Sequence, residues 1–155
     1  KVSAGLNDGE GVFYGKCAEL CGPSHALMDF KVKSLERNDF DAWIAAMQAT
    51  EGQTADKESS DVGEATFANS CLSCHAISGV GVSGALGPNL TTFGDRNRVA
   101  GFMDHTEEDV VEWIMDGMKP KSKLKPGNLM TGKYNVSEAE AEAIAKYLMS
   151  LSVED

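Results

Sequence analysis

The sequence predicts a mixed fold, with a partial β part at the N-terminus and an all-α domain after it. Apolar and polar residues alternate along residues 28–35, as in a strand with one buried face. After residue 63, apolar residues instead recur at helical spacing. Between the two parts lies a stretch that is almost free of large apolar side chains. The 155 residues are enough for one ordinary domain or two small ones, and this pattern favours two.

The first part is expected to form two strands and a helix. Residues 12–14 are a short strand run, and a loop rich in Cys, Gly and Pro joins them to residues 28–35. Asn38 is expected to cap a helix that ends near Met47. Because an isolated hairpin is marginal in water, we expect residues 1–48 of this chain to be disordered or irregularly packed.

Residues 49–62 predict a flexible linker. They are rich in Glu, Asp, Ser, Thr and Gly, and their only large apolar residue is the last one. This segment divides the chain into an N-terminal part, residues 1–48, and a helical part, residues 63–155.

The helical part is predicted to contain three main helices. Residues 64–73 form a short helix, and Thr106 with Asp109 forms a capping box for residues 107–117. Ser137 and Glu140 form a second capping box. The helix that follows carries one apolar stripe, which consists of Ile144, Tyr147, Leu148 and Leu151.

Charge and hydropathy exclude two classes of partner for the chain as given. The net charge of −10 argues against nucleic acid, because phosphate binding needs a basic face. No run approaches the ~20 continuous apolar residues of a membrane helix, so the chain is expected to be soluble as supplied. It begins at Lys1 without a leader, so we expect a fragment or processed form of a longer protein.

The strongest motif is Cys71, Cys74 and His75, which matches the attachment signature of c-type haem. Two thiols on adjacent turns reach the two vinyl groups of one macrocycle, and the imidazole then lies under the iron. A thioredoxin-like redox pair would need an α/β pattern, which is absent. A zinc site would need a second ligand pair, and only His105 is left in this part.

A thioether is expected as the sixth ligand of the iron, because it raises the reduction potential of an electron carrier. Met130 is favoured, since it lies in an irregular loop with no regular structure to compete for it. Met118, just past a helix end, is the rival. His105 precedes a helix cap and is expected to be solvated or associated with that cap. The remaining methionines of this part, Met103, Met115 and Met149, are less suited.

Residues 63–151 resemble a class I cytochrome c domain. Gly63 and Phe67 match the first helix of that family, and Ile144 and Tyr147 match the last helix, which crosses it. Residues 87–90, Gly-Pro-Asn-Leu, match the loop on the histidine side.

This resemblance implies roles for two further residues. The carbonyl of Pro88 would accept the Nδ1 proton of His75 and fix its tautomer. Arg96 is either a partner of a haem propionate or an ordinary surface arginine. The family usually has Pro after its methionine ligand, whereas this chain has Thr131.

A second constellation lies in the loop between the predicted strands. Cys17, Cys21, His25 and Met28 offer two thiolates, an imidazole and a thioether, which suits a soft copper site. A structural disulfide between the two cysteines is the alternative. The run resembles the dinuclear copper (CuA) loop of cytochrome c oxidase subunit II. By that resemblance the cysteines bridge two coppers, His25 and Met28 are terminal ligands, and Glu19 contributes its backbone carbonyl.

The copper pattern is incomplete, because residues 1–16 contain no second histidine. A dinuclear site is therefore expected in the full-length protein and not in this chain. The resemblance makes residues 1–48 a remnant of a cupredoxin domain, followed by an all-α class I cytochrome c domain.

Together the two motifs resemble subunit II of the caa-type haem–copper oxidases. This resemblance implies electron transfer through haem c and CuA to subunit I, where oxygen is reduced. It also implies that the full-length protein is part of a membrane-anchored enzyme, with these domains on the outer face of the bacterial plasma membrane. The electron donor would be a quinol-oxidising complex or a cytochrome c. A free soluble cytochrome c, a haem sensor with an open iron position and a nitrous oxide reductase are the alternatives.

Two surface features complete the expectations. The apolar walls of the haem pocket are expected to be Leu86, Leu90, Phe93, Trp113, Ile114 and Leu129. A basic rim around the haem edge either steers a redox partner or is simply solvated, and it consists of Lys119, Lys121, Lys123, Lys125 and Lys133.

Overall fold

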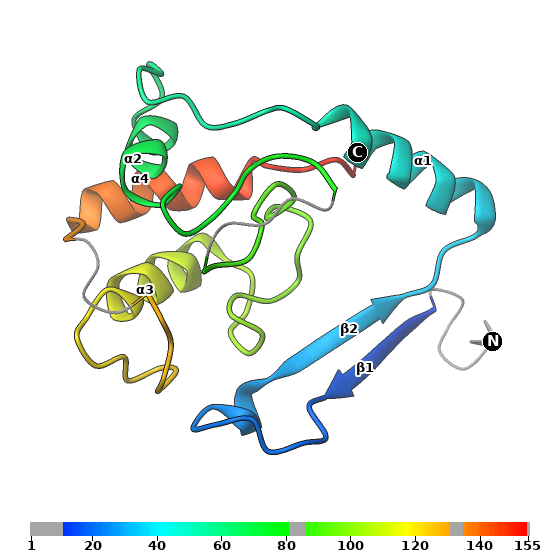
Figure 1. Cartoon of the computed structure of the whole chain (residues 1–155), viewed down its shortest axis with the longest axis horizontal. Coiled ribbons are helices and arrows are strands. Elements are labelled where there is room, and N and C mark those ends of the chain that lie inside the picture. The colour runs from blue at the N-terminus through cyan, green and yellow to red at the C-terminus, as the bar shows by residue number, and fades with distance from the viewer. Residues whose placement is uncertain (1–10, 81–85, 131–134, 155) are drawn as a thin grey trace.

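The computed structural model describes residues 11–80, 86–130 and 135–154. Figure 1 shows a hairpin with one helix on one side and three helices with long loops on the other. The first group comprises β1 (Val12–Lys16), a 3-10 turn η1 (His25–Leu27), β2 (Asp29–Lys33) and α1 (Arg37–Ala49). The second comprises α2 (Val62–Ser70), α3 (Glu107–Gly117) and α4 (Glu138–Met149). This order agrees with the predicted mixed class, β first and α after it.

The hairpin pairs β1 and β2 antiparallel, with Gly15 opposite Phe30. A Cβ on Gly15 would lie 2.2 Å from the Phe30 ring, so the glycine leaves room for the aromatic side chain across the strands. The expectation of disorder or irregular packing is wrong for residues 11–48. The physical reason is that the hairpin is not isolated, because its loop and β2 both contact the helical part.

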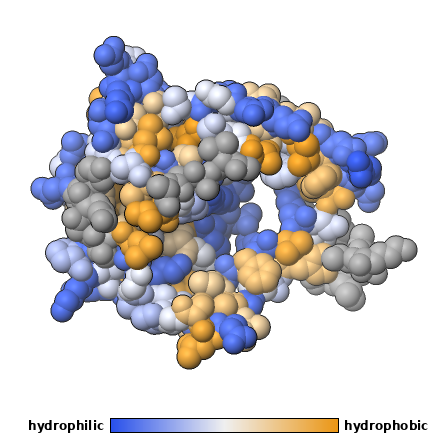
Figure 2. Space-filling model, in the orientation of Figure 1, coloured by the Kyte–Doolittle hydropathy of each residue, from blue (hydrophilic) through white to orange (hydrophobic). Residues whose placement is uncertain are grey.

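Helix α1 begins two residues earlier than expected. Glu36 occupies the N-cap position without a side-chain hydrogen bond, and Asn38 is the second helical residue. The predicted Asn38 cap is therefore wrong. An ion pair between Arg37 and Asp41, 2.8 Å long, joins the first turn to the next and supports this earlier start. Figure 2 shows apolar surface over the hairpin and α1, and the most exposed large apolar residues there include Tyr14, Phe30, Val32 and Phe40.

Helices α2 and α4 cross at a glycine. A Cβ on Gly63 would lie only 2.1 Å from the carbonyl oxygen of Ala143, so only glycine permits this approach. The rings of Phe67 and Tyr147 pack 5.9 Å apart beside the crossing. Burial, with Glu64 and Asp61 nearby, raises the pKa of Tyr147 to about 12. The resemblance implied this crossing, and it forms the centre of the core with Ile144 and Leu148.

The three helices of the second group have side-chain N-caps. Asp61 accepts a hydrogen bond from the Glu64 N–H at 2.8 Å, which explains why α2 begins before residue 64. Thr106 accepts from the Asp109 N–H and caps α3. Ser137 and Glu140 bond reciprocally at the start of α4, so this predicted capping box is confirmed in both halves.

Part of the predicted linker packs against the helical part. Ala55 is 4% exposed and belongs to the hydrophobic core. The Asp56 N–H donates to the Glu64 carboxylate at 3.1 Å. The boundaries at 48, 49–62 and 63 stay predictions.

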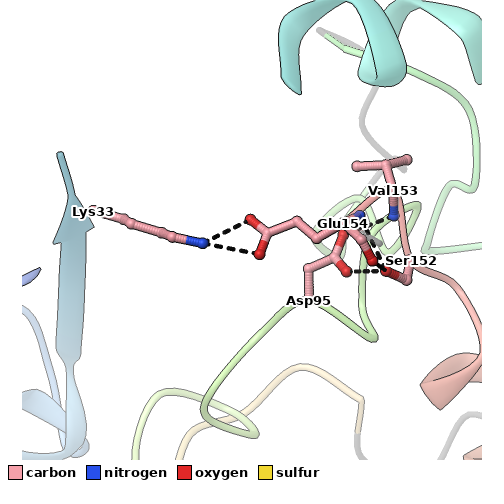
Figure 3. Close-up of polar contacts among 5 residues, drawn as sticks. All are labelled: Lys33, Asp95, Ser152, Val153 and Glu154. Atoms are coloured by element: carbon pink, nitrogen blue, oxygen red, sulfur yellow. Dashed lines mark hydrogen bonds and ion pairs between the residues drawn. The ribbon is translucent and has the colours of Figure 1, made fainter. Parts of the chain in front are cut away.

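The C-terminal segment joins the hairpin to the helical part (Figure 3). The Lys33 ammonium on β2 lies 2.9 Å from the Glu154 carboxylate. Asp95 accepts hydrogen bonds from the Ser152 hydroxyl and from the Val153 N–H, the latter at 3.0 Å. In the described ranges, none of the helices combines the length and apolar character that crossing a membrane requires.

Candidate functional site

Cys71 and Cys74, the cysteines of the predicted haem motif, lie on a single turn directly after α2. Cys71 is the C-cap of the helix, and its carbonyl accepts from the N–H groups of Cys74, at 3.0 Å, and His75, at 2.9 Å. Both cysteines are free thiols. This tight turn places two thiols and an imidazole on one short segment, so all three can reach one planar ligand.

The imidazole of His75 is held from its other side. Its Nδ1 lies 2.9 Å from the Pro88 carbonyl oxygen, which can only accept a hydrogen bond. Nδ1 therefore carries the proton, and Nε2 is left as the lone-pair atom. Burial lowers the pKa of His75, although the Pro88 bond opposes this, and the nearby Arg96 lowers it further. The neutral imidazole, which is the form that binds iron, is thereby favoured.

The residues present fit a covalently bound haem. A Cβ on Gly87 would lie 2.5 Å from the imidazole ring, so this glycine is the cradle that lets Pro88 approach. Burial, with Cys74 nearby, raises the pKa of Cys71 to about 11, so this thiol is protonated at neutral pH. Two thiols for the vinyl groups and an imidazole with a free Nε2 are what covalent attachment and ligation of haem c need, and a methionine thioether is the usual sixth ligand in cytochromes c.

The Met130 side chain lies against the C-terminal end of α3. Its Sδ and Cε are 3.6 and 3.4 Å from the point where a Cβ on Gly117 would sit. The Met130 N–H donates to the Asn128 Oδ1 at 2.6 Å. Met118, the rival ligand, is the C-cap of α3 and packs partly against the core. Thr131 lies outside the described residues.

Arg96 and His105 both bond to backbone carbonyls. A guanidinium N–H of Arg96 donates to the Asn89 carbonyl, and the group lies 5.5 Å from the centroid of Phe93. Arg96 is half-buried, and its role toward a haem propionate stays a prediction. The Nε2 of His105 lies 2.9 Å from the Phe93 carbonyl oxygen, which occupies one of its two ring nitrogens.

The expected pocket walls divide into two groups. Leu90, Phe93 and Ile114 are buried in the core and Trp113 packs against it. Leu86 and Leu129 are 62% and 70% exposed.

The lysines of the expected basic rim also fall into two groups. Lys125 is half-buried and donates to the Ala100 carbonyl at 2.6 Å, so it is not a free rim residue. Lys133 lies outside the described residues, and the exposed members are Lys119, Lys121 and Lys123.

The predicted copper ligands also lie close to one another. The Cys21 Sγ lies 3.6 Å from the Cys17 Sγ, 3.6 Å from the His25 Nδ1 and 3.7 Å from the Met28 Sδ. The Cys17 Sγ donates to the Glu19 carbonyl at 3.1 Å. The five residues singled out in this loop thus lie together, and both thiols are free rather than paired as a disulfide. The pKa of Cys21 is raised, chiefly by its hydrogen bond with Cys17.

This thiolate, imidazole and thioether set fits copper better than a hard cation. One ligand atom each from Cys17, Cys21 and His25 lie within 4.8 Å of one another. Along the described residues no second histidine joins them, in keeping with the incomplete pattern. The role of the loop as one side of a dinuclear copper site stays a prediction.

Residues 17–28, called the copper loop for the ligands expected there, face the loop that carries Met130. The Ser24 hydroxyl of the copper loop donates to the Pro126 carbonyl of the loop that carries Met130, at 2.6 Å. An open cavity of about 170 Å³ lies between these loops and is lined by Cys21, His25 and Met28 on one side and Lys125, Pro126 and Asn128 on the other. Sequence reasoning missed Ser24 because nothing in the local pattern indicates which surface a loop serine meets.

Asp116 is a second residue that the sequence did not reveal. Its buried carboxylate accepts from the Ser122 hydroxyl and from the N–H groups of Lys123 and Leu124, at 2.5, 3.1 and 3.0 Å. Burial raises the pKa of Asp116, but these bonds, with Lys119 nearby, outweigh it and hold the pKa below its usual value. This carboxylate fixes the start of the loop that leads to Met130. An acidic residue in the last turn of a helix, where the dipole disfavours it, was the available signal.

A CxxCH turn beside crossing helices, with a histidine held by a proline carbonyl, defines a c-type cytochrome domain. Residues 60–152 match the family model described as cytochrome c, and the chain belongs to that family. Residues 3–35 match the model for the periplasmic domain of cytochrome c oxidase subunit II. Membership of the cytochrome c family implies a haem, and the predicted resemblance to an oxidase subunit II with a fused cytochrome is confirmed.

Relatives named cytochrome c oxidase subunit 2 match nearly the whole chain. The chain is 50% identical to cytochrome c oxidase subunit 2 of Bacillus sp. (strain PS3), over 93% of this chain and 40% of the relative. It is 45% identical to the subunit 2 of Alkalihalophilus pseudofirmus, over 94% of this chain and 41% of the relative. It is 44% identical to the subunit 2 of Bacillus subtilis (strain 168), over 92% of this chain and 40% of the relative. The chain therefore spans about 40% of the length of these relatives, each of which is named as a subunit of an enzyme complex.

Proposed function

We propose that this chain is the electron-transfer part of subunit II of a caa-type haem–copper oxidase. It would carry electrons through covalent haem c and, in a longer protein, CuA, toward the oxygen-reducing subunit I. The observation that carries the proposal is that one chain holds both a haem-attachment turn, with His75 oriented by Pro88, and a cluster of copper-type ligands whose loop faces the segment leading to Met130 across one cavity. The enzyme would be the whole oxidase, and this chain alone would be an electron-transfer module.

The haem-side residues have separate roles in this proposal. Bound haem c supplies a one-electron iron couple. Cys71 and Cys74 would form the thioether links, and His75, oriented by Pro88, would bind the iron through Nε2. Met130 would be the sixth ligand, and Arg96 would neutralise a propionate once its bond to Asn89 opens.

The copper-side residues would hold two metal ions in the longer protein. Cys17 and Cys21 would bridge the coppers, and His25 and Met28 would each bind one of them. The Cys17 contact with Glu19 supports the role of that carbonyl as an additional ligand. One terminal imidazole is still needed, and it would come from outside the described residues.

The position of the loops supports transfer between the two centres. The Ser24 to Pro126 hydrogen bond brings the copper loop into contact with the segment that leads to Met130. On the neighbouring loop, a Cβ at Gly101 would lie 3.4 Å from the Leu27 carbonyl oxygen, so backbones also approach there. These contacts join the copper loop to the cytochrome part at two places.

The context of the longer protein follows from the same proposal. The exposed apolar face around Phe30 and Val32 would be covered by the rest of a cupredoxin sheet. The donor would be a quinol-oxidising complex or a cytochrome c, and the exposed lysines Lys119, Lys121 and Lys123 would attract an acidic donor surface. The protein would be membrane-anchored, with these domains on the outer face of the bacterial plasma membrane.

Denaturing mass spectrometry of the holoprotein tests the haem assignment. The polypeptide should carry one haem that survives denaturation. The Cys71→Ser/Cys74→Ser variant should lose it, whereas the matched Cys17→Ser/Cys21→Ser variant should retain it. Haem that survives denaturation in the first variant, or is lost in the second, would contradict the assignment.

Copper titration tests the second centre and separates the proposal from a free soluble cytochrome c. The full-length protein should show a mixed-valence two-copper signal by paramagnetic resonance, and this chain should not. A full-length protein that binds haem but no copper would favour the diffusible carrier. A stoichiometric two-copper signal from this chain would show that its ligand set is more complete than the described residues indicate.

A further inference from the structure

The two ends of the Asn128 amide lie in different surroundings. Its Oδ1 accepts the Met130 N–H at 2.6 Å. Its Nδ2 is buried, and among the described residues it has no hydrogen-bond partner. Because the Met130 N–H requires an acceptor, the oxygen must face it, and the orientation of the amide is fixed. The unpaired donor is therefore a consequence of the fold and not of an arbitrary amide assignment.

A buried amide donor without an acceptor destabilises a protein, so such a group in a functional loop points to an acceptor that arrives with a ligand. The Met130 sulfur lies in the same region. Nδ2 and the Met130 Sδ lie 3.7 and 3.6 Å from the same point, the position of a Cβ on Gly117. The absence of a side chain at Gly117 leaves the space in which these two groups meet.

The loop around Asn128 is fixed on both sides. The carboxylate of Asp116 holds residues 122–124 through three hydrogen bonds. The Asn128 N–H donates to the Lys125 carbonyl at 3.2 Å, and Ser24 holds Pro126. A donor on a fixed loop can act on a neighbouring sulfur without reorganisation.

We propose that Asn128 is a positioning residue for the methionine ligand. Its carbonyl oxygen fixes the Met130 backbone, and its NH₂ group donates a hydrogen bond to the thioether sulfur once that sulfur binds iron. This inference rests on the proposed function, in which Met130 is the sixth ligand. Donation to the sulfur withdraws electron density from it, disfavours the ferric state and raises the reduction potential.

The reduction potential of the holoprotein tests this role. Asn128→Leu removes the donor with little change of volume and no change of charge. The loss of one neutral hydrogen bond is expected to lower the equilibrium constant for reduction about fivefold, which is ~40 mV for a one-electron couple. The control Asn97→Leu makes the same replacement at an exposed position and should leave the potential unchanged. An Asn128→Leu potential equal to that of the parent overturns the inference.

The far-red charge-transfer band of the ferric protein separates this inference from the ligand assignment. If Met130→Ala retains the band, Met130 is not the ligand and the assignment itself fails. If Met130→Ala loses the band while Asn128→Leu leaves the potential unchanged, only the role of Asn128 fails.

A measurement on the unmodified holoprotein avoids any folding defect of a variant. In the reduced, diamagnetic protein, the side-chain NH₂ protons of Asn128 should show a nuclear Overhauser effect to the Met130 methyl group and slow exchange with solvent. Fast exchange without that effect would overturn the proposal.

Discussion

Replacement of Gly63 by alanine should destabilise the protein through the crossing of α2 and α4. The added Cβ would lie 2.1 Å from the Ala143 carbonyl oxygen, 2.7 Å from its carbon and 2.9 Å from the Tyr147 Cβ. Ordinary van der Waals contact begins near 3.4 Å, so the helices must separate by more than an ångström. Backbone atoms of a packed helix cannot rotate away as a side chain can.

The magnitude follows from two opposed effects. Overpacking of a core costs about 1–3 kcal/mol, and rigid backbone neighbours favour the upper end. Alanine inside a helix recovers about 1 kcal/mol relative to glycine. The net loss of about 2 kcal/mol corresponds to a fall of ~4–8 °C in the unfolding midpoint for a chain of this size.

Thermal unfolding of the holoprotein, followed by far-ultraviolet circular dichroism, measures this change. The matched control is Gly117→Ala, also a helical glycine, whose Cβ would meet only the ends of the Met130 and Asn128 side chains, at 3.4 Å or more. The control should be neutral or slightly stabilising. A Gly63→Ala midpoint at or above that of the parent would refute the reasoning from close helix contact.

Three further changes have effects that the structure specifies. Asp116→Asn should lower the free energy of unfolding by about 2 kcal/mol at neutral pH, because charge-assisted bonds to Ser122 and two backbone amides are weakened. Since the pKa of this carboxyl is lowered in the fold, the difference from the parent should shrink as pH falls through that pKa, and a constant difference in urea unfolding would contradict this. Ser137→Ala should cost about 1 kcal/mol, the usual value of an N-cap, and an unchanged urea midpoint would argue against capping. Lys33→Ala should change stability by less than ~1 kcal/mol, because its ion pair with Glu154 is solvent-exposed, and a larger loss would show that this contact secures the hairpin.

Local chemistry made part of this molecule predictable. The capping box of Ser137 and Glu140 depends on atoms three residues apart, so the sequence alone contains it. The haem turn is local for the same reason, since Cys71, Cys74 and His75 are joined by their own backbone hydrogen bonds.

The remainder depends on partners that are distant along the chain. Asp61 caps α2, but no apolar pattern begins there, so the sequence placed the helix start at residue 64. Asn38 has the chemistry of a cap, yet the helix begins before it. The meeting of Ser24 with Pro126 joins residues 102 positions apart, and no local periodicity reports such a contact. The burial of Ala55 could not be predicted either, because the segment around it has a composition typical of linkers.

The attachment of the hairpin at two places affects how its loop meets the helical part. Ser24 holds the copper loop at Pro126, and Lys33 holds the far end of β2 at Glu154. Two weak contacts on one chain act at an effective concentration of the order of millimolar, far above that of separate proteins in dilute solution. The encounter between the two loops is therefore unimolecular. Its rate should not depend on protein dilution, and an electron that has entered the chain does not have to wait for a collision.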